Sequence, residues 1–325
     1  MGILGLFARP EAEDLYDDYE GYDGYEYQEP YQEEYEEPAP ERPVEFPGVQ
    51  PIRSVADMQI VLTQPKEYRA ASQIADLLRD MNLYTTDAIV DKAMSYLQRR
   101  TEGEPVAYIT GSWEFYGIPL AVTPDVLIPR MDTEVMIDAV KELLVGRKMD
   151  ARILDLCCGS GCIACALAKE MPATRLVCVD ISASALQVCR LNIDRNHLES
   201  RVLCMQADAL SSPPLGIGLF DVIVSNPPYI ATEEIDTLDP SVRDHEPFWA
   251  LDGGEDGLKF YKGIIKHWRT VLRPGGLIFF EVGENQAETV TDMLLRAGFA
   301  EAECREDSAG IPRVVIGRTS ENESV

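Results

Sequence analysis

One stretch of this chain constrains its fold more than any other: a strand-like run at 152–156 that leads through a glycine-containing turn into a helical segment at 162–170. An apolar run bounded by turn formers is typical of a buried strand. Strand-like and helical patterns then alternate along the chain, which predicts an open, mostly parallel, doubly wound sheet of the Rossmann-like α/β class. We expect further strands at 114–122, 176–179, 202–205, 220–225, 277–282 and 313–317, and helices at 86–100, 134–144, 184–196, 261–272 and 287–297.

The composition narrows the range of partners. The chain has 325 residues and a net charge of −27, from 56 acidic and 29 basic residues. A phosphate backbone repels so acidic a protein, so we expect no direct binding of nucleic acid. The sequence contains neither a run of about 18 apolar residues, the length that spans a bilayer, nor a secretory signal, so we expect a cytoplasmic protein.

Composition also divides the chain into four regions. Residues 1–48 form an acidic, tyrosine-rich tail with too little apolar surface to fold, and we expect it to be disordered. Its start, residues 1–8, is apolar and predicts at most a weak membrane contact. Residues 49–82 have the pattern of a β-α unit, residues 83–110 that of a helical linker, and residues 111–320 that of the main α/β domain.

The turn after the first strand of the main domain reads Asp-Leu-Cys-Cys-Gly-Ser-Gly. Its two glycines, Gly159 and Gly161, let the backbone approach a ligand closely, and the helix that follows presents free N–H groups to an anionic part of that ligand. No Lys-Ser/Thr follows the glycines and no third glycine stands at dinucleotide spacing, which argues against a phosphate or dinucleotide loop. We expect the ligand to contact Asp155, Cys157, Cys158, Gly159, Ser160 and Gly161.

Two further strand ends carry a carboxylate. Asp180 ends the next strand, where an acidic residue commonly binds two ribose hydroxyls, and Asp208 and Ala209 follow a third strand. Each aspartate alone is explained better as a cap of the helix after it. Together, however, they indicate a nucleoside ligand without a pyrophosphate. S-adenosylmethionine fits this description, with its amino-acid end at Asp155 and the glycine turn, its ribose at Asp180 and its adenine at Asp208.

A fourth strand, at 220–225, is followed by Asn226-Pro227-Pro228-Tyr229, at the edge of the sheet where ligands bind in this class. The prolines remove two N–H donors, so the backbone carbonyls here are free to face a cleft. With the Asn226 oxygen and the Tyr229 ring, they can hold a planar NH2 group with its nitrogen aimed at an electrophile. A plain turn is the alternative for the tetrapeptide alone. We expect Asn226, Pro227 and Tyr229 to act in catalysis, all four residues to bind substrate, and Asn226 also to border the cofactor.

The cysteines do not have the spacing of a metal site. Of the eight in the chain, six lie between Cys157 and Cys189. The pair Cys162 and Cys165 forms a C-x-x-C motif, but no second pair stands at zinc-ligand spacing and the chain has only three histidines. We therefore expect these cysteines to pack as small buried side chains, without a metal.

Residues 86–318 resemble the HemK/PrmC family of release-factor glutamine methyltransferases, which are class I S-adenosylmethionine-dependent enzymes. The matching stretches are GEPVAYITGSWEFYGI, VTPDVLIPRMDTE, ILDLCCGSGCIA, VDIS, VIVSNPPYI, EPFWALDGGEDGLKFYKGII and LRPGGLIFFEVGENQ. The chain departs from the family in two places. The family's glycine loop commonly reads D-L-G-T-G-S-G where this chain has Cys157 and Cys158, a position that mainly needs a small side chain. The family's amino-terminal helical substrate-binding domain is reduced here to little more than one helix.

The resemblance implies N5-methylation of a glutamine side-chain amide, in the GGQ motif of class I peptide chain release factors. The release factor is then the protein partner, S-adenosylmethionine the cofactor, and the enzyme a monomer. Two alternatives stay open. An adenine-N6 DNA methyltransferase uses the same loop on a similar planar amine after flipping the base.

The second alternative comes from residues 1–82, which resemble a truncated SepF, a bacterial cell-division protein. The resemblance rests on the MGILGLF start, the acidic linker and PIRSVADMQIVLTQPKEYRAASQIADLLRDMN. In that family the start binds membrane, and the β-α unit continues into a second strand that is missing here after Asn82. A membrane-associated division factor is the function that this part implies.

Overall fold

The computed structural model describes residues 87–146 and 148–321 of the chain. The expectations for residues 1–82, namely the tail, the membrane contact and the β-α unit, lie outside these described residues. Among the described residues, no helix combines the length and the apolar character needed to cross a membrane.

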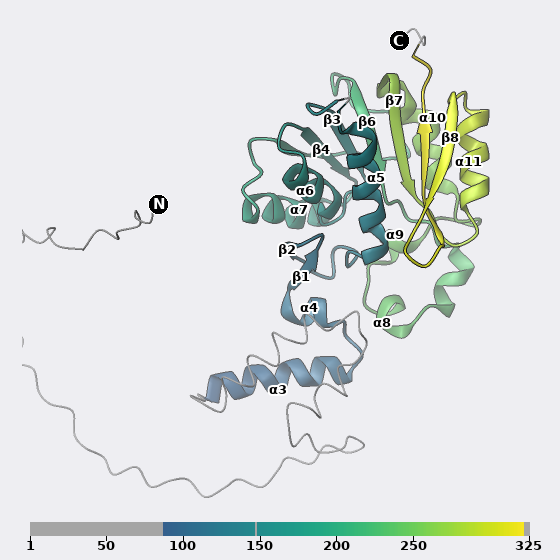
Figure 1. Cartoon of the computed structure of the whole chain (residues 1–325). Coiled ribbons are helices and arrows are strands. Elements are labelled where there is room, and N and C mark those ends of the chain that lie inside the picture. The colour runs from purple at the N-terminus through teal and green to yellow at the C-terminus, as the bar shows by residue number, and fades with distance from the viewer. Residues whose placement is uncertain (1–86, 147, 322–325) are drawn as a thin grey trace, which may run out of the picture. The chain divides into compact units, whose positions relative to one another are not determined.

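The domain is built on a seven-stranded sheet with the order β5-β4-β3-β6-β7-β9-β8 (Figure 1). The strands from β5 to β7 pair in parallel, whereas β9 runs antiparallel to both β7 and β8. The expected mostly parallel α/β sheet is thus confirmed. The strands are β3 (Arg152–Leu156), β4 (Arg175–Asp180), β5 (Val202–Gln206), β6 (Phe220–Ser225), β7 (Leu272–Glu281), β8 (Glu301–Glu306) and β9 (Pro312–Arg318).

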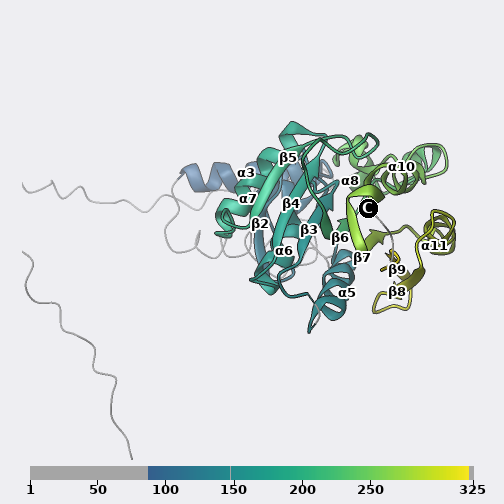
Figure 2. The ribbon, with the colours of Figure 1, turned by 90° about the horizontal axis from the view of Figure 1, so that it is seen from above.

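Helices cover both faces of this sheet, as Figure 2 shows from above. Neighbouring side chains of β3 illustrate why: Ile153 packs into one buried cluster with α5, α6 and α7, and Leu154 into another with α10 and α11. Successive strand residues face opposite sides, so a strand buried on both faces is apolar throughout. These helices are α5 (Glu134–Leu144), α6 (Cys162–Glu170), α7 (Ala183–Arg195), α10 (Lys259–Trp268) and α11 (Ala287–Arg296).

Shorter elements connect and precede this core. The expected helix at 86–100 is present as α3 (Asp87–Thr101), and the side chain of Arg99 binds Glu104 in the turn that leads to α4 (Val106–Thr110). The remaining elements are β1 (Ser112–Phe115), β2 (Ile118–Ala121), η2 (Met131–Thr133), η3 (Thr232–Thr237), α8 (Pro240–Arg243), α9 (Phe248–Leu251) and η4 (Arg269–Val271).

Two expectations about strands were wrong. The single strand expected at 114–122 is a hairpin of β1 and β2, because Tyr116 and Gly117 adopt positive φ angles of 49° and 73° and reverse the chain. Two consecutive positive φ values are typical of a tight hairpin turn. Strand β8 was not expected at all. It lies at the edge of the sheet, and its residues are exposed or half-buried, so its sequence lacks an apolar run.

The buried amide of Asn192 on α7 joins the hairpin to the domain, together with the amide of Asn196, which donates to the Pro119 carbonyl at 3.1 Å. The Asn192 Oδ1 accepts a hydrogen bond from the Ala121 N–H at 2.6 Å, and its Nδ2 donates to the carbonyls of Ala121 and Ser160, both at 2.9 Å. Ser160 belongs to the glycine turn. A single side chain therefore connects β2, α7 and the predicted cofactor loop.

We expect Asn192→Ala to lower the free energy of unfolding by about 2–3 kcal/mol, because it leaves buried backbone groups of Ala121 without partners. Chemical denaturation of the wild type and the variant measures this difference. Asp194→Ala, on the exposed side of the same helix, is the matched control and should change stability by less than about 0.5 kcal/mol. An Asn192 variant as stable as the control would contradict the role of the amide.

Candidate cofactor and acceptor site

A cavity of about 300 Å³ opens at the carboxyl ends of β3, β4 and β6. Nine of the residues predicted from the sequence line it: Cys157, Cys158, Gly159, Ser160, Asp180, Asp208, Ala209, Asn226 and Pro228. The other four, Asp155, Gly161, Pro227 and Tyr229, do not form its wall. The structure therefore brings the two predicted sites, the glycine turn and the Asn-Pro-Pro-Tyr loop, to one place.

The glycine turn owes its shape to three left-handed backbone positions. Cys157, Gly159 and Gly161 have φ angles of 60°, 51° and 75°. A left-handed cysteine is strained, so Cys157 stands where a glycine is favoured for its backbone and not only for its size. Gly161 also has no room for a side chain, since a Cβ there would lie 2.5 Å from the Cys189 sulfur.

Asp155 lies behind the turn instead of in the cavity. It is fully buried, its Oδ2 accepts a hydrogen bond from the Ala164 N–H at 3.2 Å, and its Oδ1 has no partner among the described residues. Burial raises the pKa of this carboxyl well above its ordinary value. Asp155 therefore supports the start of α6, which corresponds to the capping alternative for this residue.

Asp180 and Asp208 combine a structural bond with a place at the cavity wall. The two Asp180 oxygens accept from the N–H groups of Gly159 and Ser182, both at 2.9 Å, and Asp208 accepts from the Leu210 N–H at 2.8 Å. Each carboxylate oxygen can accept more than one hydrogen bond. Both residues can therefore hold hydroxyl or amine groups of a nucleoside while they shape their loops.

The apolar part of the cavity was not assigned from the sequence. Besides the residues above, the wall contains aliphatic and aromatic side chains that can contact a flat ring: Val126, Leu127, Pro129, Ile163, Val179, Ile181, Leu210, Trp249 and Phe260. Trp249 is 57% exposed, which is unusual for so large an apolar side chain. Two acidic groups opposite apolar walls suit a nucleoside such as that of S-adenosylmethionine.

At the acceptor side, Asn226 is half-buried and its Nδ2 donates to Thr133 Oγ1 at 3.3 Å. Thr133 stands at the start of α5 and was not expected to take part. Tyr229 turns away from the cavity: its hydroxyl lies 3.5 Å from Glu281 Oε1, and its carbonyl accepts from Gln286 Nε2 at 2.9 Å. The Tyr229 ring therefore does not line the cavity, and the predicted catalytic role of Tyr229 in the acceptor loop (Asn226–Tyr229) stays a prediction.

Three glycines surround Tyr229 and fix this arrangement. A Cβ at Gly257 would lie 2.4 Å from the Tyr229 carbonyl oxygen, one at Gly253 would lie 2.8 Å from the Tyr229 Cα, and one at Gly283 would lie 3.1 Å from the Tyr229 ring. The Gly253 N–H also donates to the Ile230 carbonyl at 2.8 Å. The segment after α9 thus packs directly on the acceptor loop, which only glycine allows.

The cysteines form a cluster behind the glycine turn. The sulfur atoms of Cys158, Cys178 and Cys189 lie within 4.8 Å of one another, and Cys204 Sγ is 3.4 Å from Cys189 Sγ. If the thiols of these three buried cysteines were ionised, their negative charge would lie close to the carboxylate of Asp180. The expectation that these cysteines pack without a metal stays a prediction.

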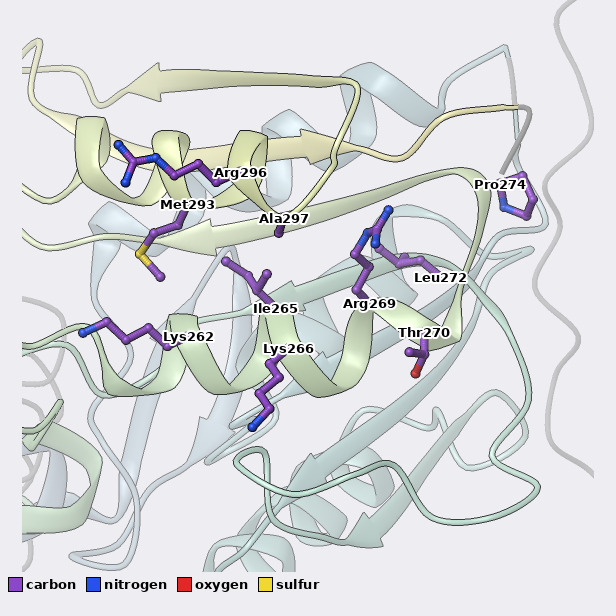
Figure 3. A pocket seen from close by; sticks show the side chains of 10 residues that line it. All are labelled: Lys262, Ile265, Lys266, Arg269, Thr270, Leu272, Pro274, Met293, Arg296 and Ala297. Carbon is purple, nitrogen blue, oxygen red and sulfur yellow. The ribbon is translucent and has the colours of Figure 1, made fainter. Parts of the chain in front are cut away.

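A second hollow, of about 690 Å³, lies between α10, α11 and the first residues of β7 (Figure 3). Four basic side chains line it, those of Lys262, Lys266, Arg269 and Arg296, over an apolar base that includes Ile265 and Met293. None of the residues predicted from the sequence lines this hollow. It is therefore separate from the site described above.

Comparison with known proteins identifies the family. Residues 131–239 match the family model described as "Methyltransferase small domain". The chain is 46% identical over 220 residues to a release factor glutamine methyltransferase of Geobacter sulfurreducens, a match that spans 68% of this chain and 75% of that protein. The chain belongs to the release factor glutamine methyltransferase family. The protein of the same name from Caulobacter vibrioides is 39% identical over 257 residues, 79% of this chain and 82% of that protein.

Solved structures agree with the fold. The hMettl16 catalytic domain, in complex with a MAT2A 3'UTR hairpin, matches with a TM-score of 0.52 at 16% identity, over 74% of this chain and 84% of that one. The chain is an enzyme with the class I methyltransferase fold, and its methyl donor is S-adenosylmethionine. The resemblance of residues 1–82 to SepF is not borne out by the comparisons.

We expect Asp180→Ala to weaken the binding of S-adenosylhomocysteine about tenfold or more, because a carboxylate makes charge-assisted bonds to ribose hydroxyls. Calorimetric titration measures the affinity. Asp194→Ala, on the exposed side of α7, should bind as the wild type does. Unchanged affinity in the Asp180 variant would mean that Asp180 serves only to hold the turn.

We expect Gly257→Ala to lower turnover about 10²-fold while cofactor affinity stays within about threefold, because the new methyl group displaces the acceptor loop. Gly257 has a φ of +69°, so the matched control is Gly111→Ala, which has a φ of +67° but nothing within 4 Å of the added Cβ. Steady-state kinetics and calorimetry on both variants distinguish the steric clash with Tyr229 from the strain of an alanine at a positive φ angle. Equal losses in the two variants would contradict the packing argument.

Proposed function

We propose that this protein transfers a methyl group from S-adenosylmethionine to the side-chain amide nitrogen of a glutamine in a class I peptide chain release factor. The observation that carries the proposal is the Asn226 amide at the wall of the cavity, with its NH2 group bonded to Thr133. An amide whose NH2 group already donates a hydrogen bond presents its oxygen to the acceptor. The relatives at 39–46% identity support glutamine as that acceptor.

Methyl transfer to an amide requires the protein to position the amide nitrogen more than to supply an acid or a base. A neutral amide nitrogen is a poor nucleophile, so the site must hold it in line with the methyl group. The cofactor supplies that methyl group on a positively charged sulfur. The Asn226 oxygen accepts a hydrogen bond from the glutamine NH2 group, which fixes its plane and orients the nitrogen. The Pro227 carbonyl, which the sequence predicts to share this role, belongs to a residue that does not line the cavity. No base is required before transfer, since the product loses its proton afterwards.

The adenine-N6 alternative uses the same kind of loop, since adenine also presents a planar amine. The net charge of −27 argues against stable binding of duplex DNA. A protein acceptor carries no such phosphate backbone. We therefore propose a release factor as the partner. We also propose that the enzyme acts in the cytoplasm as a monomer.

We expect Asn226→Ala to reduce methyl transfer about 10²-fold or more while affinity for S-adenosylhomocysteine remains within about twofold, because Asn226 holds the acceptor and only borders the cofactor. The assay follows labelled methyl groups from S-adenosylmethionine into either a release factor or duplex DNA. The wild type should label the release factor alone. Wild-type turnover in the variant would contradict the role of Asn226, and labelling of DNA would contradict the proposed substrate.

A further inference from the structure

Glu281, the last residue of β7, is buried next to the Asn226–Tyr229 loop, 3.5 Å from the Tyr229 hydroxyl, and has no part in the mechanism above. Its side chain is 2% exposed, and its Oε2 has no hydrogen-bond partner among the described residues. A buried carboxyl with an unpaired oxygen destabilises a fold. Packing alone therefore does not explain an acidic residue at this position.

The groups around Glu281 are those of the acceptor loop. The Tyr229 hydroxyl lies 3.5 Å from its Oε1, and hydrogen bonding from the side chains of Thr133 and Asn226 favours its charged form. The Asn226 Nδ2 in turn donates to Thr133 Oγ1 at 3.3 Å. Polar side chains from two different segments, those of Thr133, Asn226 and Tyr229, thus surround one carboxyl group.

This arrangement determines which end of the Asn226 amide faces the acceptor. An asparagine amide can turn so that either its oxygen or its NH2 group points outward, and its partners decide between the two. A carboxylate on the inner side accepts hydrogen bonds only, so it attracts the NH2 group. The Thr133 hydroxyl can then donate to Glu281 and accept from Asn226. The oxygen of Asn226 is left to face the cavity.

We propose that ionised Glu281 is a positioning residue, which holds the Asn226 amide with its oxygen toward the glutamine NH2 group. The inference rests on the proposed function, because the outward oxygen matters only for an acceptor with N–H groups. A protonated Glu281 has a donor of its own and no longer selects this orientation. Methyl transfer should therefore depend on the charge of Glu281.

Burial raises the pKa of Glu281 to about 7. Hydrogen bonding from Thr133 and Asn226 and the charge of Arg313 on β9 oppose this shift, and Asp132 on η2 adds to it. Tyr261 on α10 donates its hydroxyl to the Glu281 carbonyl at 2.9 Å, and Tyr229 completes the titratable groups around the carboxyl. The active, ionised form is then gained as the pH rises through about 7, so kcat should fall on the acid side of this value.

The same shift predicts the effect on stability. The folded-state pKa lies above the ordinary value of 4.5, so the folded protein binds this proton more strongly than the unfolded chain. The contribution of Glu281 to stability is therefore present below about pH 4.5 and is lost as the pH rises toward 7. Above pH 7 an uncharged residue at this position should be at least as stable as Glu281.

The test is Glu281→Gln, which keeps the shape and removes the charge. We expect kcat for release factor methylation to fall about tenfold or more, while the KM for the release factor and the affinity for S-adenosylhomocysteine change less than about twofold. The fall in kcat below pH 7 that we expect of the wild type should be absent from the variant. Its melting temperature at pH 8 should equal or exceed that of the wild type.

Coupling to Asn226 distinguishes positioning from a general effect. If Glu281 acts through Asn226, adding Glu281→Gln to Asn226→Ala should lower kcat by less than about twofold further. The matched control is Asp221→Asn on β6, at the opposite end of the parallel strands, where the carboxylate pairs with Arg273 at 2.8 Å. The control should keep the wild-type kcat and pH profile.

Any one of three results would overturn the inference. The first is a Glu281→Gln variant with wild-type kcat and pH profile; the second is one that melts lower and loses cofactor affinity, which would show a packing role. Failure of the proposed function looks different, since the wild type itself would then leave the release factor unmethylated. Fully additive losses in the double variant would also contradict an action through Asn226.

Discussion

A hydrogen bond from Ser225 Oγ to the Leu156 carbonyl, at 2.7 Å, joins the last residues of β6 and β3. The glycine turn begins one residue after Leu156, and the acceptor loop begins one residue after Ser225. Parallel pairing of the two strands, in which Leu156 is the partner of Ser225, therefore sets the distance between methyl donor and acceptor amide. Reactive groups must approach to about 3–3.5 Å for transfer, so this register governs the rest of the site.

The sequence predicts the layered sheet and the two loops well, because both follow from local patterns. The helices at 134–144 and 162–170 and the strand at 220–225 have the expected bounds. Long apolar stretches and the turn formers that end them determine such elements. What the sequence could not predict depends on contacts between distant segments: the inward turn of Tyr229, the place of Asp155 behind the loop, and the glycines that pack on Tyr229.

The site also shows how function and stability oppose each other. Asp155 and Glu281 are both buried, each with one oxygen that has no hydrogen-bond partner in the described part of the chain, and Cys157 has a left-handed backbone. Each feature destabilises the fold, and each lies next to the cavity, where strained and unpaired groups are typical of functional sites. The two large apolar clusters, one on each face of the sheet, offset this loss of stability.

In the proposed function, the loop at Asn226 presents a glutamine amide to the methyl donor. The most direct measurement is tandem mass spectrometry of a release factor incubated with the enzyme and isotope-labelled S-adenosylmethionine. We expect one labelled methyl group, on the side-chain nitrogen of a single glutamine. A label on another residue type, or none on the release factor under conditions where the enzyme binds its cofactor, would contradict it.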